Sequence, residues 1–303
     1  MLPLVRGKVD RMSCSRSTDL AELAGARSIS VAEVPVAENE PLARDTYRLR
    51  IYHPPMARRF LPGQFLMLRL ADCDDPLIGR AFALYDTVLD ERGEPCGVDV
   101  VYLVKGKLTR RLARTPVGQR VLVWGPLGNS FPPIAVDEVV MVAGGIGQTP
   151  FLAWARELAG QRMFGEPPRR VPVVPRRLLL YGTRTADLLA GLEAFAQAGL
   201  EVQLATEDGS RGHAGRVTEL LEKILQCGKR PAVVACGPDP MLAAVAQLCF
   251  QYEVPCWVSL ETPMACGIGI CFSCVARVRQ DGDWDYRRTC VEGPVFDARC
   301  LVW

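Results

Sequence analysis

Short apolar runs separated by proline and glycine fill the first part of the chain. Residues 47–52, 64–70 and 98–104 form runs of strand length, and little of this region shows helical spacing. Such a pattern favours short strands joined by turns. We therefore expect an antiparallel β-barrel over residues 28–134.

The pattern changes at Glu138. Residues 139–143 form a continuous apolar run that enters a glycine turn, and residues 151–158 carry apolar side chains at helical spacing. Further strands are expected at 178–181, 202–205 and 232–235, and helices at 186–198, 216–226 and 240–252. Strands that alternate with helices are typical of a parallel, doubly wound α/β domain, which we place at residues 135–252.

Three segments lie outside these two patterns. Residues 1–27 form an N-terminal extension. Residues 165–177 contain four prolines and four arginines, and we expect an exposed insertion to which we assign no function. Residues 253–303, rich in cysteine and glycine, form a small third module.

Composition narrows the class of protein. The chain has 303 residues, of which 49% are hydrophobic and 23% charged, with a net charge of +2. This balance is that of an ordinary globular protein and disfavours disorder and electrostatic nucleic-acid binding. The sequence shows no secretion signal and no apolar run of membrane-spanning length, so we expect a cytoplasmic protein without a membrane partner.

The most specific motif is a group of cysteines. Four of the twelve cysteines lie between residues 266 and 290, namely Cys266, Cys271, Cys274 and Cys290. The spacing C-x4-C-x2-C followed by a distant cysteine is that of plant-type [2Fe–2S] ligands. A structural zinc site is the alternative, although zinc sites usually carry two short paired knuckles and here the fourth cysteine stands alone.

Basic residues accompany this motif. Arg277, Arg279, Arg287 and Arg288 could offset the negative charge of such a cluster, and they are equally consistent with a solvated face.

Two glycine turns follow predicted strands of the α/β domain. The first contains Gly144, Gly145, Ile146, Gly147, Gln148 and Thr149, and the second contains Cys236, Gly237 and Pro238. Such turns offer backbone N–H groups and a helix N-terminus to a pyrophosphate, and they also occur as plain α/β architecture. If they bind a ligand, both should converge where open α/β sheets bind nucleotides.

Other candidate residues give weaker signals. Arg80 precedes Phe82 in the barrel, where a guanidinium beside an aromatic ring suits a phosphate and a planar ring, or is simply a surface pair. His53 and His213 stand apart from acidic or serine partners in the sequence, which favours loop or core roles over catalysis.

The order of barrel, glycine turns and cysteine module resembles the ferredoxin–NADP reductase superfamily with a C-terminal [2Fe–2S] module. Within it, the chain is most similar to the electron-transfer subunits of NAD-dependent, two-subunit dihydroorotate dehydrogenases. The resemblance rests on residues 62–65, 80–83, 125–129, 144–147, 207–210, 236–238, 261, 264–267 and 290–296.

This resemblance implies FAD on the barrel and NAD on the α/β domain. The flavin ring and ribityl chain would lie near Arg80, Ala81, Phe82, Ala83, Val101, Tyr102 and Leu103, and the flavin pyrophosphate near Leu108 and Thr109. Three positions depart from the family, which usually has serine at Ala83, arginine at Leu103 and glycine at Leu108.

The resemblance also implies an oxidoreductase that carries electrons and has no catalytic acid or base of its own. Electrons would pass from an FMN-containing subunit that oxidises dihydroorotate to orotate in pyrimidine biosynthesis, through [2Fe–2S] and FAD, to NAD+. The two subunits would form a heterotetramer of two plus two. The alternatives are an FAD/[2Fe–2S] subunit of a ferredoxin- or hydrogenase-linked NAD(P)H oxidoreductase, and a nucleotide-binding module without enzymatic activity.

The acidic stretch after residue 205 bears on the choice of nucleotide. Glu207 and Asp208 could accept hydrogen bonds from a ribose 2′-hydroxyl and would repel a 2′-phosphate, which favours NAD over NADP. Arg184 and Arg211 argue the other way, since either could pair with that phosphate.

Overall fold

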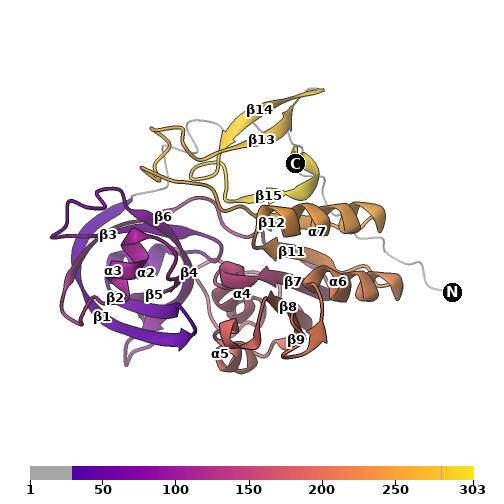
Figure 1. Ribbon diagram of the computed structural model, residues 1–303, viewed down its shortest axis with the longest axis horizontal. Coiled ribbons are helices and arrows are strands. Elements are labelled where there is room, and N and C mark those ends of the chain that lie inside the picture. Colours follow the sequence, from indigo (N-terminus) through magenta and orange to yellow (C-terminus); the bar gives the residue numbers. More distant parts are fainter. Residues whose placement is uncertain (1–28, 281) are drawn as a thin grey trace.

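The first part of the chain forms a closed, antiparallel barrel. The computed structural model describes residues 29–280 and 282–303, so the predicted extension at residues 1–27 lies outside the described residues. The barrel strands follow the order β1-β2-β5-β4-β3-β6 (Figure 1). Their bounds are β1 Ser30–Ala43, β2 Thr46–Tyr52, β3 Phe65–Leu70, β4 Arg80–Leu89, β5 Pro95–Leu103 and β6 Arg120–Leu127, with short helices α2 Pro54–Arg59 and α3 Lys107–Leu112.

Strand β4 packs against both domains because its side chains alternate between two buried faces. Phe82 and Leu84 point into the barrel core, as expected for a period of two. The pairing of β4 with β5 then shifts register between Leu84 and Asp86. Tyr85, on the opposite face of the strand from Leu84, packs into the core of the α/β part, edge to face with Phe195. One strand therefore links the barrel interior to the second domain.

The second part is a seven-stranded sheet in the order β10-β9-β8-β7-β11-β12-β15. All neighbouring strands are parallel except β12 and β15. The strands are β7 Glu138–Gly144, β8 Arg176–Thr183, β9 Glu201–Thr206, β10 His213–Ala214, β11 Ala232–Cys236, β12 Cys256–Ser259 and β15 Val295–Asp297. The predicted fold class is confirmed.

Helices cover this sheet. They are η1 Gly145–Gln148, α4 Phe151–Leu158, η2 Ala186–Leu188, α5 Leu192–Gln197, α6 Val217–Gln226 and α7 Asp239–Gln251. The continuous helix expected over 186–198 is wrong. The chain breaks between η2 and α5, where Gly191 takes a φ of 72° and the backbone N–H of Ala190 donates to the Tyr181 hydroxyl.

The proline- and arginine-rich segment is anchored as well as exposed, which corrects the expectation of an exposed insertion. Val174 is fully buried, and strand β8 already begins at Arg176. Arg169 donates to both carboxylate oxygens of Glu157, and its remaining nitrogen reaches Ser130 and the Phe131 carbonyl. The segment therefore packs between helix α4 and the chain that leaves the barrel.

The third part sits above the other two in Figure 1. It contains the hairpin β13 Val275–Gln280 and β14 Asp283–Arg288, and the final turn η3 Ala298–Cys300. Strands β12 and β15 lie within residues 253–303 and yet extend the nucleotide-domain sheet. The domain boundaries at 134/135 and 252/253 stay predictions, and the module shares a sheet with its neighbour.

No helix in the described ranges combines the length and apolar character needed to cross a membrane.

Candidate functional site

The four cysteines of the motif come together at the side of the barrel. Cys274 and Cys290 are buried, Cys266 is partly buried, and Cys271 is exposed. The backbone of Cys274 is held by Thr289, whose N–H and hydroxyl both donate to its carbonyl oxygen at 2.7 and 3.0 Å. Since Thr289 directly precedes Cys290, this contact fixes the third and fourth cysteines relative to each other.

The thiols lie close enough to influence one another. The Cys271 sulfur lies 3.2 Å from the Ser273 hydroxyl, Cys266 acts on the pKa of Cys271, and Cys274 and Cys266 act on the pKa of Cys290. Hydrogen bonds from Ser273 and Cys266 lower the pKa of Cys271 to about 6, whereas burial raises the pKa of Cys290 to about 12.

The spacing of the four cysteines, and the closeness of their thiols, suit a [2Fe–2S] cluster. A structural zinc ion takes four ligands around one centre, whereas in a [2Fe–2S] cluster the sulfides share the coordination and each iron needs only two cysteines. The residues present therefore fit the iron–sulfur cluster. They would hold it through Cys266, Cys271, Cys274 and Cys290.

The loop of residues 266–274, called the cysteine loop below, packs directly on the barrel. Cys274 and Cys290 form one apolar cluster with Phe65, Met67 and Leu127, and Ala81 packs against it. Gly267 has a φ of 72°, and a β-carbon there would lie 2.6 Å from the Met67 side chain. Only glycine fits this close approach between the loop and strand β3.

Two polar contacts reinforce the same junction. The Trp124 Nε1 donates to the Cys266 carbonyl at 2.8 Å. Asn129 donates through Nδ2 to the carbonyls of Glu292 and Val295, and its Oδ1 accepts from the Val295 N–H. The turn after β6 therefore holds the segment that follows Cys290.

Of the four arginines near the motif, Arg288 contacts the cysteine loop. It donates to the Gly269 carbonyl at 3.1 Å, pairs with Glu292, and lies 5.1 Å from the centre of the Phe272 ring. The hydrogen bond with Glu292 raises the pKa of Arg288. Arg277 instead covers Trp284, and Arg287 pairs with Asp285.

The predicted flavin residues alternate between two faces of the barrel wall. Phe82, Tyr102 and Leu108 are buried in the barrel core, and Phe82 meets Tyr102 edge to face. The Phe82 ring therefore does not lie beside the Arg80 guanidinium on the surface, contrary to the expectation from the sequence. Arg80 is exposed, and the small side chains of Ala81 and Ala83 are half-buried. Such a surface leaves room for a flat ring on the outer face of β4.

Other predicted flavin residues lie on strand β5 and helix α3 of the barrel domain. Val101 packs toward the α/β core, and Leu103 ends strand β5. The Thr109 hydroxyl accepts from the backbone N–H groups of Lys105 and Gly106 at 3.0 Å. The loop before α3 is therefore ordered by Thr109, and a β-carbon at Gly106 would meet no other atom.

The two glycine turns converge, as the sequence predicts. They follow the adjacent parallel strands β7 and β11, from which the chain continues in opposite directions across the sheet, toward β8 and β12. A β-carbon at Gly147 would lie 2.2 Å from the Cys236 carbonyl, and one at Gly144 2.6 Å from the Met241 sulfur. This point is where open α/β sheets bind nucleotides.

Buried polar groups mark the same place. Gln148 is fully buried, and neither atom of its side-chain amide has a hydrogen-bond partner among the described residues. Burial raises the pKa of Cys236 to about 12, so this thiol stays neutral. Gly145 has a φ of 55° and open space beside it. An orphaned amide and an open glycine fit a turn that is completed by a bound nucleotide.

Both histidines have partners that the sequence did not reveal. His53 caps helix α2 by accepting from the Met56 N–H, and its Nε2 lies 3.2 Å from the Ser30 hydroxyl. His213 lies 2.7 Å from Glu219.

Fold and site together define a flavin- and iron–sulfur-dependent oxidoreductase subunit. The family described as "Oxidoreductase FAD-binding domain" matches residues 33–131, and the "Iron-sulfur cluster binding domain of dihydroorotate dehydrogenase B" matches residues 261–302.

Relatives and solved structures agree with these matches. The electron transfer subunit of dihydroorotate dehydrogenase B (NAD(+)) from Desulforamulus reducens is 33% identical over 86% of this chain and 94% of its own. That from Bacillus caldolyticus is 36% identical over 88% of this chain and 96% of its own. A structure of an NADH-dependent reduced ferredoxin–NADP oxidoreductase superposes with a TM-score of 0.72, at 25% identity, over 92% of this chain and 91% of its own.

The chain belongs to the family of electron transfer subunits of NAD+-dependent dihydroorotate dehydrogenase B. The predictions of an FAD-binding oxidoreductase domain and an iron–sulfur domain are confirmed. The assignments of individual residues to each cofactor stay predictions.

Proposed function

We propose that this chain takes electrons from an FMN-containing subunit that oxidises dihydroorotate to orotate, and delivers them to NAD+. One observation carries the proposal most directly. The cluster ligands Cys274 and Cys290 share an apolar cluster with Met67, against which Ala81 of β4 packs. Because Ala81 belongs to the stretch assigned to the flavin, the iron–sulfur site and the flavin site adjoin through one layer of side chains.

The chemistry of the bound groups explains why they are combined. When bound, FAD exchanges a hydride with the nicotinamide and single electrons with the [2Fe–2S] cluster. The chain's residues position these groups: Phe65, Met67 and Leu127 keep water from the junction, and Trp124 and Asn129 fix the cysteine loop against the barrel. The convergent turns at Gly147 and Gly237 support a nicotinamide nucleotide at the carboxyl ends of the central strands β7 and β11.

The partner subunit would dock on the exposed side of the cysteine module. Ile270 and Phe272 of the cysteine loop are 75% and 62% exposed. On the neighbouring hairpin, the cross-strand pairs Arg277 with Tyr286 and Arg279 with Trp284 place two arginines and two aromatic rings on one face.

This set of residues has the composition of an interface. Tyrosine, tryptophan and arginine are the residue types enriched at interface centres. We assign this surface, made of the cysteine loop and the outer hairpin face, to the FMN-containing catalytic subunit in a two-plus-two assembly.

Reconstitution tests this function. The purified chain alone should pass electrons from NADH to artificial acceptors and show no dihydroorotate oxidation. With the catalytic subunit from the same source it should catalyse dihydroorotate-dependent reduction of NAD+. Dihydroorotate turnover by the isolated chain, or no coupling in the mixture, would overturn the proposal.

A matched pair of tyrosines tests the docking surface. Tyr286 is 52% exposed on the hairpin face, and Tyr52 is 51% exposed on barrel strand β2. Tyr286→Ala should weaken the complex about fivefold or more, since truncating an interface anchor costs over ~1 kcal/mol, whereas Tyr52→Ala should not. Equal effects of both substitutions would place the interface elsewhere.

A second candidate has its own support. The similarity to the NADH-dependent reduced ferredoxin–NADP oxidoreductase covers nearly the whole chain, and Ala83, Leu103 and Leu108 depart from the pattern expected for the family. These features favour a subunit with a different electron partner, for which the solved structure suggests ferredoxin. Coupling to reduced ferredoxin but not to a dihydroorotate-oxidising subunit would select this alternative.

A further inference from the structure

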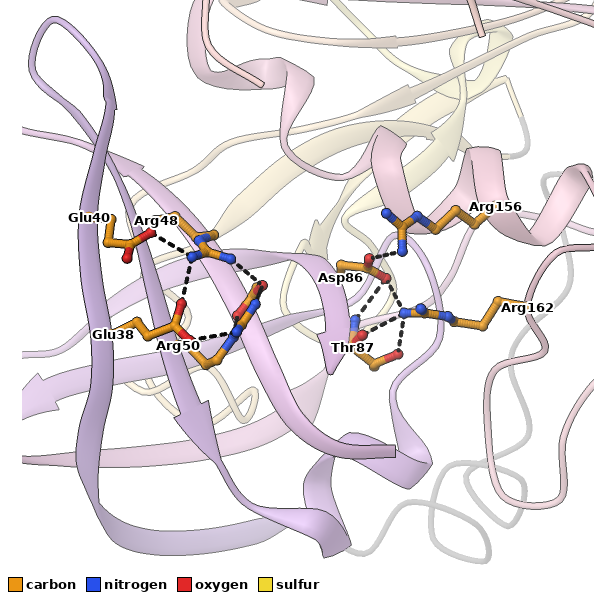
Figure 2. Close-up of polar contacts among 9 residues, drawn as sticks. Glu38, Glu40, Arg48, Arg50, Asp86, Thr87, Arg156 and Arg162 are labelled. Carbon is orange, nitrogen blue, oxygen red and sulfur yellow. Dashed lines mark hydrogen bonds and ion pairs between the residues drawn. The ribbon is translucent and has the colours of Figure 1, made fainter. Parts of the chain in front are cut away.

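A buried carboxylate joins the barrel to helix α4. Asp86 of β4 is 7% exposed, and two arginines of the α/β part reach it (Figure 2). Arg156 of α4 lies 2.7 Å from Oδ2, and Arg162, shortly after the helix, lies 2.8 Å from Oδ1. Arg162 also donates to the backbone carbonyl of Thr87. The barrel supplies the carboxylate, and the nucleotide domain supplies both guanidinium groups.

The neighbouring carboxylate shows that this division is specific. Asp99 of β5 lies directly opposite Asp86 in the sheet register and is 5% exposed. Its partners both belong to the barrel: Arg50 binds it at 2.7 and 2.8 Å, and Arg48 at 3.5 Å. Figure 2 shows Arg48 and Arg50 also bound to Glu38. The barrel's own arginines are thus engaged by other carboxylates.

A second ionic contact starts from the next residue of α4. Glu157 is 2% exposed and accepts two hydrogen bonds of 2.7 Å from Arg169. Arg169 in turn binds Ser130 and Phe131, where the chain leaves the barrel. Two consecutive residues of α4 therefore contact different parts of the barrel domain: Arg156 reaches strand β4, and Glu157 reaches the chain after β6 through Arg169.

These ion pairs connect the segment assigned to the flavin with the segment assigned to the nicotinamide nucleotide. Helix α4 begins directly after the glycine turn assigned to the nicotinamide nucleotide, and Asp86 lies three residues beyond the stretch from Arg80 to Ala83 assigned to the flavin. Hydride transfer needs the reacting atoms about 3–3.5 Å apart, and a displacement of about 1 Å can cost a hundredfold in rate. The contact that joins these segments therefore acts on a sensitive distance.

The energetics argue against a role in stability alone. Burial raises the pKa of Asp86 and lowers the pKa of Arg162, so both groups lose hydration that their partners do not fully replace. Buried ion pairs of this kind contribute little net stability compared with apolar side chains of the same volume. Fixing one geometry is the role for which such pairs are best suited.

We propose that Asp86, through Arg156 and Arg162, is a positioning residue that sets the nicotinamide turn at hydride-transfer distance from the flavin strand. The proposal rests on the proposed function, because it presupposes that NADH and the flavin exchange a hydride in this chain.

Anaerobic stopped-flow reduction of the purified, cofactor-loaded chain by NADH tests it. Asp86→Asn keeps the shape and removes the charge. It should lower the limiting rate of flavin reduction about tenfold and weaken the absorbance band of the NADH–flavin complex, with the Kd for NADH within about twofold of the parent. Arg156→Gln should act in the same direction. Arg156→Lys, which can still reach Oδ2 with a positive charge, should restore most of the rate.

Asp99→Asn is the matched control, with similar burial, the neighbouring strand and partners inside the barrel. It should lower the melting temperature and leave the limiting rate unchanged. An equal loss of rate in Asp99→Asn, an unchanged rate in Asp86→Asn, or a change confined to the Kd for NADH would overturn the positioning role. If the parent chain itself were not reduced by NADH, the proposed function would fail instead.

Discussion

The indole N–H of Trp124 donates a 2.8 Å hydrogen bond to the carbonyl oxygen of Cys266, which joins barrel strand β6 to the first cysteine of the cluster motif. The adjacent Gly267 packs on Met67, so the loop has both a polar and an apolar contact with the barrel. A ligand loop anchored at its first residue loses less conformational entropy when it closes around a cluster. The barrel therefore helps to build the iron–sulfur site.

Replacing Trp124 tests this support. Trp124→Phe removes the hydrogen bond and keeps an aromatic ring, so the cluster should form but be released faster. A loss of about 1 kcal/mol corresponds to a release rate roughly fivefold higher. The decay of cluster absorbance in the presence of an iron chelator measures this rate. Trp303→Phe, at an exposed tryptophan near the C-terminus, should release iron at the parent rate.

Removing one ligand separates the cluster from the flavin. The parent chain, purified anaerobically, should contain about two iron and two acid-labile sulfide ions. Cys271→Ser should lose them, while reduction of the flavin by NADH continues, because the nicotinamide approaches from the α/β domain. Cys227→Ser, at another exposed cysteine, is the control. Stoichiometric zinc without sulfide, or loss of flavin along with iron, would contradict this assignment.

Local patterns predicted most of the fold. The helix over residues 151–158 was placed at its observed ends, because apolar side chains recur on the face that packs in the core. Cysteine spacing likewise predicted an iron–sulfur module, and the matched iron–sulfur domain at residues 261–302 includes all four cysteines. These features depend on neighbours in the sequence. The sequence did not predict the break at Gly191, where a β-carbon would collide with the Tyr85 hydroxyl, because Tyr85 is distant in the chain.

Long-range contacts explain what the sequence could not reveal. Nothing in the order of residues links Asp86 to Arg162, or Asn129 to Val295, since each pair meets only after the domains have packed. The same holds for strand β15, a three-residue segment whose place beside β12 makes the module part of the nucleotide sheet. A richly charged segment such as 165–177 looks solvated until its buried partner, Glu157, is known.

The loop after β9 predicts a preference for NADH over NADPH. Hydrogen bonds hold the Asp208 carboxylate within the loop: its Oδ1 accepts from the N–H and the hydroxyl of Ser210. These bonds lower the pKa of Asp208. Glu207 is exposed beside it and would repel a 2′-phosphate. Glu207→Gln should therefore improve flavin reduction by NADPH relative to NADH about fivefold, as expected for ~1 kcal/mol between screened charges.

The ratio of the two reduction rates is the measurement for that substitution. Glu193→Gln, at a helix-α5 carboxylate outside the loop, should leave the ratio unchanged. A parent chain that NADPH reduces as fast as NADH would show that Arg184 or Arg211 governs the choice of nucleotide.

The buried pair of Glu157 and Arg169 predicts a large loss of stability when one partner is removed. Arg169→Met leaves a carboxylate that is 2% exposed without its guanidinium, and such an uncompensated charge costs about 3–5 kcal/mol. Thermal unfolding of the cofactor-loaded chain should show this as a clearly lower midpoint. Arg170→Met, at the exposed neighbouring arginine, should change stability by less than about 0.5 kcal/mol. The double substitution Glu157→Leu with Arg169→Met removes the stranded charge and should recover most of the loss, since apolar replacement of a whole buried pair is often neutral. A double variant no more stable than Arg169→Met alone would mean that Arg169 stabilises the chain mainly through Ser130 and Phe131.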